Sequence, residues 1–236
     1  MALETWTNSM GMEFVLIPAG TFWMGSDEDD DSDALEDEKP RHEVEISRSF
    51  YLGRYPVTQA QWESVMGSNP SKFKGADRPV EMVSWDDVQE FIRKLNAQEG
   101  HERYRLPKEA EWEYACRAGS TTAYCFGNDK NQLEDYAWYW DSSGKETHPV
   151  GQKKPNAWGL YDMHGNVFEW VWDWYGEYYG SLVRDPEGPH DGEYSVLRGG
   201  SWFVYARFCR SASRSFSKSD THDANYGFRL ALSLEN

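Results

Sequence analysis

Thiol and imidazole side chains are the first candidates for chemistry in this sequence. The number of cysteines is odd and lacks the density of a disulfide scaffold, so we expect reduced thiols. The histidines are scattered along the chain, and we interpret each as a surface or loop residue and not as a metal ligand. The cysteines are Cys116, Cys125 and Cys209, and the histidines are His42, His101, His148, His164, His190 and His222.

Carboxylates are abundant, and the formal net charge is -16. That charge argues against nucleic acid and an anionic membrane surface as partners, because both select basic faces. The densest acidic runs, 26–33 and 36–38, predict a solvated, self-repelling loop. The alternative, a calcium loop, lacks the spaced glycine and distal glutamate of an EF-hand.

No stretch of the sequence is apolar enough to predict membrane insertion. The first residues also lack the basic and apolar regions of a signal peptide. We therefore expect a cytoplasmic protein, or surface display if a leader has been removed.

The segment 202–226 has side chains suited to binding. It is rich in aromatic residues, serine and aspartate, which resembles the composition of adaptable binding surfaces. Lys, Gln, Glu, Met and Trp together make up 57 of the 236 residues, so about six are expected among the 24 residues from Phe203 to Tyr226. Only one, Lys218, is present.

Three helices are predicted in the first half of the chain. Thr58 and Gln61 form a capping-box pattern that opens a short helix ending near Gly67. A second helix should begin after Ser84 and end at Gly100, because its apolar residues recur at helical spacing. The third is expected to have Pro107 in its first turn and to continue through Glu111, Trp112 and Ala115 until Gly119.

Short strands are predicted on either side of these helices. We expect two strands or a bent hairpin over 13–24 and one strand over 42–51. Further strands are predicted at 167–172, 195–198 and 228–232, within a loop-rich second half. The aromatic content of 16% fits a domain in which large side chains fill gaps between long loops. No repeat or linker is visible, so residues 1–236 are predicted to form a single domain.

Several segments together resemble the formylglycine-generating-enzyme, or sulfatase-modifying-factor, family. The resemblance implies an α+β, formylglycine-generating-enzyme-type C-type lectin fold that is loop-rich, with few helices and short antiparallel strands. It extends over nearly the whole chain. The segments are 14–20 with 24–26, 55–58, 79–80 with 83–85, 105–115, 156–170, 198–202 and 227–230.

The resemblance also suggests an oxidase, but one thiol of its site is missing. Members that make formylglycine bind copper through two cysteines near a Gly-Gly-Ser segment, and use oxygen to oxidise a peptidyl cysteine. Here the second position falls on Cys209 and the first on Val204, which cannot bind copper. Ser201 and Cys209 are the residual family positions, so we expect neither copper nor catalysis. The copper-dependent oxidase remains the alternative, together with another oxygen-using enzyme of the family; the three-histidine iron site of the related sulfoxide synthases is absent.

A structural calcium ion is also implied by the resemblance. Family members bind calcium through side chains at the positions of Asp162 and Glu169 and backbone oxygens at those of Gly165 and Val167. Hard oxygen ligands of this kind suit calcium. The alternative is that the two carboxylates hydrogen-bond the loop without metal. A second family calcium site requires asparagine where Trp138 stands, so it is not expected here.

The C-terminal segment further resembles the variable region of proteins diversified by retroelements, which share this fold. There, adenines of asparagine-type codons are randomised, and codons ending in a pyrimidine cannot encode Lys, Gln, Glu, Met or Trp. The resemblance implies a non-catalytic binding protein for an unknown protein or other macromolecular ligand; the alternative is a static loop around an altered site. The expected contacts are Trp202, Phe203, Val204, Tyr205, Phe208, Ser213, Ser215, Phe216, Ser217, Ser219, Thr221, His222, Asp223 and Tyr226.

Arginines near this segment are assigned a different role. A guanidinium can form bidentate bonds to a carboxylate or bond loop carbonyls, so we expect these residues to anchor the scaffold. They are Arg198, Arg207, Arg210, Arg214 and Arg229.

Overall fold

The computed structural model describes residues 3–27, 33–178 and 180–234. Its α-helices in this part of the chain are α1 (Gln59–Met66), α2 (Trp85–Glu99) and α3 (Glu109–Arg117). The predicted capping box of Thr58 and Gln61 is confirmed, and Ser84 is the N-cap of α2, where it forms a second capping box with Asp87. Gly67 and Gly100 end α1 and α2 in the left-handed conformation, as glycine permits without steric cost.

Helix α3 differs from the prediction at its beginning. Its N-cap is Lys108, so Pro107 precedes the helix and is not in the first turn. At the other end Ala118 takes the left-handed conformation, one residue before the predicted stop at Gly119. Every residue of α3 is buried, because the helix contacts strands of two different sheets.

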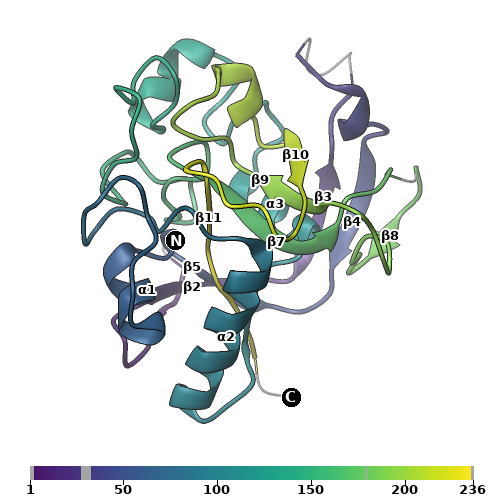
Figure 1. Cartoon of the computed structure of the whole chain (residues 1–236). Coiled ribbons are helices and arrows are strands. Elements are labelled where there is room, and N and C mark those ends of the chain that lie inside the picture. Colours follow the sequence, from purple (N-terminus) through teal and green to yellow (C-terminus); the bar gives the residue numbers. More distant parts are fainter. Residues whose placement is uncertain (1–2, 28–32, 179, 235–236) are drawn as a thin grey trace.

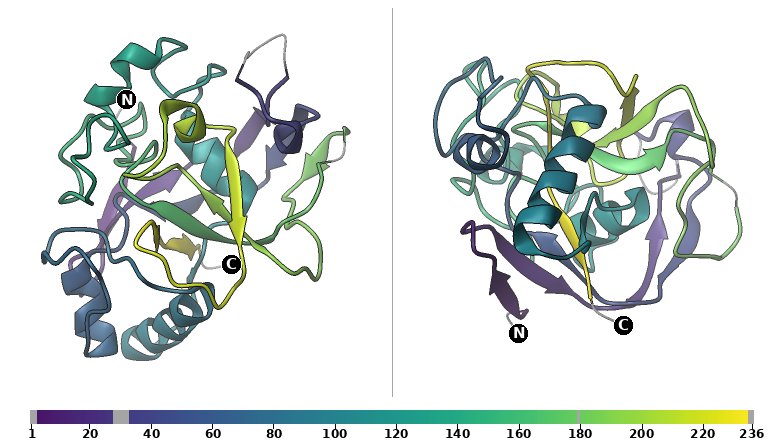
Figure 2. Two further views of the ribbon diagram at one scale, coloured as in Figure 1. Left: turned by 45° about the horizontal axis from the view of Figure 1, so that its top comes forward. Right: turned by 60° about the horizontal axis from the view of Figure 1, so that its bottom comes forward.

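A five-stranded sheet joins the two ends of the chain. Its order is β1-β2-β5-β12-β6, and its neighbours are antiparallel. The early strand β2 and the late strand β12 flank β5, and Figures 1 and 2 show them on the side where both termini lie. The strands are β1 (Thr5–Thr7), β2 (Glu13–Ile17), β5 (Phe50–Gly53), β6 (Tyr104–Arg105) and β12 (Ala231–Ser233).

Two smaller sheets hold the rest of the strands in the described residues. The four-stranded sheet has the order β10-β9-β7-β11, and the three-stranded sheet β3-β4-β8. Most pairs are antiparallel, as predicted, but β11 runs parallel to β7 and β8 parallel to β4. The strands are β3 (Gly20–Met24), β4 (His42–Ile46), β7 (Phe168–Trp174), β8 (Val183–Arg184), β9 (Ser195–Arg198), β10 (Arg214–Ser217) and β11 (Tyr226–Phe228).

Several predicted strands are divided between sheets. The run 13–24 forms β2 and β3, which belong to different sheets, so the bent hairpin is wrong and the two separate strands are right. The predicted strand 42–51 likewise becomes β4 and β5, and 228–232 contributes to β11 and β12. The reason is that the apolar pattern continues unchanged where the chain leaves one sheet and enters another, so the sequence does not show the break.

The acidic region is only partly as predicted. Residues 28–32 lie outside the described part of the chain, whereas 36–38 form the short helix η1 (Glu36–Glu38). The expectation of a solvated loop is wrong for Glu38, which is fully buried beside Arg210. A guanidinium that is paired with a buried carboxylate compensates its charge and donates the hydrogen bonds that water would otherwise supply, so the carboxylate can be buried. No helix within the described ranges is long and apolar enough to span a membrane.

Candidate binding surface

The segment 202–226 folds into η3 (Ala206–Cys209), the edge strand β10 and the loop that leads into β11, on the near side of the molecule in Figure 1. Three of its aromatic side chains are largely exposed: Phe203 by 48%, Tyr205 by 57% and Phe216 by 44%. Apolar side chains that are exposed together, and not singly, are typical of contact surfaces.

Two of these side chains form an aromatic patch with Trp140. The Trp140 ring centroid lies 5.0 Å from that of Phe203 and 5.4 Å from that of Tyr205. The main chain joins the same two segments, since Trp140 donates its backbone N–H to Val204 O at 3.0 Å. Sequence analysis did not find Trp140, because no local pattern connects it to a segment more than sixty residues away.

Phe216 is the third exposed aromatic residue and lies on β10. Its ring packs against Tyr175 at 4.2 Å and Tyr194 at 5.2 Å. The flanking residues Ser215 and Ser217 are half-buried. Since β10 pairs only with β9 among the described strands, one edge of β10 remains open beside these side chains.

The loop 218–225 is held mainly through its backbone. Ser219 O accepts from Asp86 N at 3.3 Å and Asp223 O from Met82 N at 3.0 Å, both near the beginning of α2. Ala224 O accepts from the Trp202 indole at 2.9 Å. Every residue has a backbone carbonyl, whatever its side chain. This loop can therefore keep its path when exposed side chains change.

The predicted contact residues therefore divide into three groups. Trp202 and Ser213 are buried, and Trp202 is part of the scaffold, so their side chains lie below the exposed part of the segment. Phe203, Tyr205, Phe216 and His222 are exposed; His222 also bonds Asp87 at 2.7 Å. The half-buried remainder consists of Val204, Phe208, Ser215, Ser217, Ser219, Thr221, Asp223 and Tyr226.

Buried arginine–glutamate ion pairs lie in the interior of the domain, beneath this surface. Each arginine side chain is almost inaccessible to solvent and meets a buried carboxylate, as predicted for the anchors. The pairs are Arg198 with Glu113, Arg210 with Glu38, Arg214 with Glu109 and Arg229 with Glu169. Arg207 is the exception: it is exposed, lies over the Phe208 ring at 4.4 Å and forms no ion pair with the described residues.

The residual thiol position lies in the interior. Cys209 is fully buried, and burial raises the pKa of its thiol well above the ordinary value. Val204 packs against the small cluster that contains Cys209, while the Ser201 hydroxyl bonds Asn225 at 3.2 Å. A buried, protonated thiol beside a hydrocarbon side chain is poorly suited to bind Cu(I).

Two histidines are buried: His164 lies in a loop, as expected, whereas His42 lies in strand β4, so the expectation of a surface or loop residue is wrong for His42 alone. His164 receives a hydrogen bond from Cys125 N at 3.1 Å and bonds Cys209 O at 2.8 Å, so both ring nitrogens are used. His42 is also buried, with Nδ1 bonded to Pro40 O. Among the described residues, no group of three or more His, Cys, Asp or Glu side chains is arranged to hold a metal ion.

Glu169 does not fit the calcium site that the family resemblance suggests. Its Oε1 accepts from Arg229 Nη2 at 2.6 Å. Its Oε2 accepts from Arg229 Nε at 2.6 Å and from Trp112 Nε1 at 2.6 Å. A guanidinium that covers both oxygens leaves neither of them free and repels a divalent cation.

Asp162 likewise bonds the protein itself. Its two oxygens accept from Gly151 N at 2.8 Å and from the Asn166 side chain at 3.2 Å. Burial raises the pKa of Asp162 to about 6. Gly165 O also accepts a hydrogen bond, from Val167 N at 3.0 Å. These contacts correspond to the alternative in which the carboxylates bond the loop without metal.

Chelation should therefore leave the stability of the protein unchanged. We expect EDTA to shift Tm by less than about 1 °C, whereas a site saturated at a hundred times its Kd would add about 2.7 kcal/mol to the folded state. Differential scanning calorimetry with EDTA, and with added calcium, measures the shift. A rise of several degrees that depends on calcium would contradict this assignment.

The three sheets, the buried α3 and the long loops that carry the surface define the formylglycine-generating-enzyme type of C-type lectin fold. The chain belongs to the family of sulfatase-modifying factor enzyme 1-like domains, whose model matches residues 2–234. It is 33% identical to the formylglycine-generating enzyme of Mus musculus over 80% of this chain and 53% of that protein, so it spans about half the length of the mouse enzyme. It is 34% identical to the chaperone protein LppX of Paenibacillus barcinonensis, over 65% of this chain and 69% of that protein.

Two solved structures resemble the whole domain. Treponema denticola variable protein 1 is 33% identical, with a TM-score of 0.86 and coverage of 97% of this chain and 98% of that chain. PvdO from Pseudomonas aeruginosa is 30% identical, with a TM-score of 0.88 and 99% of both chains covered. The resemblance to a variable protein agrees with the one suggested by the sequence of 202–226.

Proposed function

We propose that this chain is a non-catalytic ligand-binding protein, the variable protein of a diversity-generating retroelement. The observation that carries the proposal is the arrangement of 202–226: its exposed aromatic side chains stand on a backbone that carbonyl hydrogen bonds and buried arginine pairs hold in place. Such a segment can change its surface without losing its shape. The likeness to Treponema denticola variable protein 1 over nearly the whole chain supports the same function.

The ligand is proposed to lie against the aromatic patch and β10. Phe203, Tyr205 and Phe216 would supply rigid apolar area, and Ser215 and Ser217 would supply small hydrogen-bonding groups. An unknown protein or other macromolecule fits a broad surface of this kind better than a small molecule does.

The gene tests the retroelement proposal. We expect a nearby repeat of the coding sequence for 202–226 that differs at adenines, with a reverse transcriptase gene beside it. Sequencing this locus in several independent isolates should reveal protein differences confined to the exposed and half-buried positions. Identical segments in every isolate, with no such repeat, would support only a static domain.

Tolerance to substitution provides a test on the protein itself. Phe203→Ala and Phe216→Ala should each change the free energy of unfolding by no more than about 1 kcal/mol, because both side chains are largely exposed. The matched controls are Ser211→Phe and Ser213→Phe, at buried positions of the same segment, where overpacking should lower the free energy of unfolding by about 3 kcal/mol. Urea unfolding measures all four, and equal losses at exposed and buried positions would contradict the proposed binding face.

A copper assay separates this function from the oxidase alternative. The full chain is incubated with Cu(I), oxygen and a cysteine-containing peptide, and the peptide is analysed for aldehyde by mass spectrometry. We expect no conversion, because Val204 supplies no second sulfur and the Cys209 thiol is buried and protonated. Stoichiometric Cu(I) uptake with aldehyde formation would refute the proposal.

A further inference from the structure

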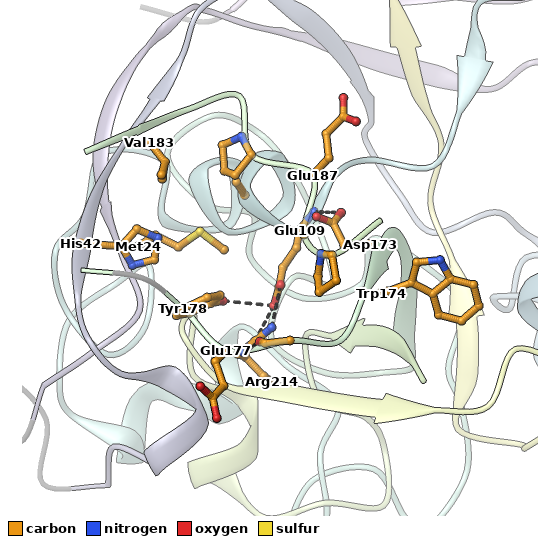
Figure 3. Close-up of a pocket in the computed structure, with 15 residues that line it drawn as sticks. Met24, His42, Glu109, Asp173, Trp174, Glu177, Tyr178, Val183, Glu187 and Arg214 are labelled. Carbon is orange, nitrogen blue, oxygen red and sulfur yellow. Dashed lines mark hydrogen bonds and ion pairs between the residues drawn. The ribbon is translucent and has the colours of Figure 1, made fainter. Parts of the chain in front are cut away.

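A pocket of about 350 Å³ lies away from the aromatic patch, where the three-stranded sheet meets the beginning of α3 and the end of β7 (Figure 3). Its size is at the lower end of the range for small-molecule sites. Figure 3 places His42 and Met24 on one side of the pocket and Asp173 and Trp174 on the other. Arg214 is the only residue that the pocket shares with the segment 202–226.

The two most prominent charges of the pocket satisfy each other. Arg214 donates to both oxygens of Glu109, at 2.7 and 2.9 Å, and its remaining nitrogen donates to the carbonyls of Asp37 and Gly176. The Tyr178 hydroxyl donates to Glu109 Oε1 at 3.1 Å. This ion pair therefore forms a wall of the pocket and has no free group for a ligand.

Two buried residues on the pocket wall each have a side-chain atom without a hydrogen-bond partner in the described residues. Asp173 is 3% exposed; its Oδ2 accepts from Glu109 N at 2.7 Å, and its Oδ1 has no further bond. His42 is 5% exposed, and its Nδ1 must carry the proton because Pro40 O can only accept. Its Nε2 has no partner among the described residues either.

The rest of the lining favours a positive charge on an apolar body. Glu177 and Glu187 add carboxylates at the rim, and Glu187 is bonded to Lys108 at 2.7 Å. The rings of Trp174 and Tyr178, with Met24, Val183 and prolines, supply apolar and aromatic surface. Aromatic faces together with carboxylates attract ammonium groups and do not attract anions.

We infer that this pocket binds a small organic amine, with its ammonium group against Asp173 and its apolar body against Met24 and Val183. Burial raises the pKa of the free Asp173 carboxyl to about 8, so its proton is released to solvent as the ammonium binds, and the carboxylate that forms gains a counter-charge and a charge-assisted hydrogen bond. This site is independent of the proposed ligand surface, so either can fail without the other.

A matched pair of probes tests the inference on the unmodified chain. Phenethylamine and 2-phenylethanol have nearly the same shape, but only the first is a cation. Isothermal titration calorimetry should show phenethylamine binding at least about tenfold more tightly, since charge-assisted hydrogen bonds are lost in the alcohol. N-acetyl-lysine methylamide provides the second arm: binding comparable to phenethylamine would identify a lysine side chain as the source of the amine. Equal affinity for amine and alcohol, or binding of neither, would overturn the inference.

A variant locates the site. Asp173→Asn keeps an oxygen for Glu109 N but cannot ionise to pair with the ammonium, and should lower the affinity for phenethylamine about tenfold or more. Glu90→Gln, on the exposed surface of α2, is the control and should leave the affinity unchanged. Unchanged affinity in Asp173→Asn would place any amine binding elsewhere and refute the assignment.

Discussion

Arg210→Met should lower the free energy of unfolding by about 3–5 kcal/mol. Two Arg210 nitrogens lie 2.7 and 2.6 Å from the two oxygens of Glu38, and both side chains are almost completely buried. Removing the guanidinium leaves a buried carboxylate without its counter-charge, which is the costly way to break such a pair. Urea denaturation followed by circular dichroism, with the slope of the transition checked for constancy, measures the loss.

The exposed pair Arg93–Glu90 is the matched control. Its side chains have similar bidentate contacts but are in water, so Arg93→Met should cost no more than about 1 kcal/mol. In the double variant Glu38→Leu with Arg210→Met, much of the stability should return, because no unpaired charge is left. A loss in Arg210→Met as small as in Arg93→Met would show that Arg210 does not anchor the segment.

This anchor attaches the segment 202–226 to distant parts of the fold. Glu38 belongs to the acidic region far upstream, and Arg210 follows η3, directly between the aromatic patch and β10. Arg214 is bonded in the same way to Glu109 at the start of α3. The segment is thus held at both ends of a short buried stretch, 211–213, while exposed side chains lie before it at Phe203 and Tyr205 and after it at Phe216.

The helices could be predicted from the sequence because their signals are local. Thr58 with Gln61 and Ser84 with Asp87 form both halves of their capping boxes, and Gly67 and Gly100 supply the left-handed residue that ends each helix. Each signal lies within a few residues of the feature it determines. The family resemblance supplied the fold itself, because its segments are distributed along the whole chain.

Non-local contacts could not be predicted. The acidic run does not reveal that Glu38 is buried, because its partner lies 172 residues away. Strand β10 was not predicted, because Phe216 is its one apolar residue and the serine and arginine residues around it give no alternating apolar pattern. The role of Trp140 and the pocket around Asp173 and His42 likewise depend on which loops and strands meet in space.

Asp173→Asn should make the protein more stable at pH 8, by several kcal/mol. Burial, reinforced by the nearby charge of Glu109, raises the pKa of Asp173 in the folded protein to about 8, against an ordinary value of 3.8. Glu111 opposes its ionisation further and Lys108 favours it weakly. Between these pH values the unfolded chain has lost a proton that the folded chain keeps, so stability falls with rising pH, by at most about 1.4 kcal/mol per pH unit.

The difference between variant and wild type isolates this effect from the other titrating groups. The asparagine amide of the variant would keep the acceptor for Glu109 N and cannot ionise, so the two proteins should differ little near pH 4 and progressively more up to pH 8. Asp162, whose pKa is also raised, titrates in both proteins and cancels. Urea unfolding at intervals of one pH unit gives the curve. A constant difference across this range would mean that Asp173 is ionised in the folded protein, and a variant that is less stable at pH 8 would show that its charge is already compensated inside the pocket.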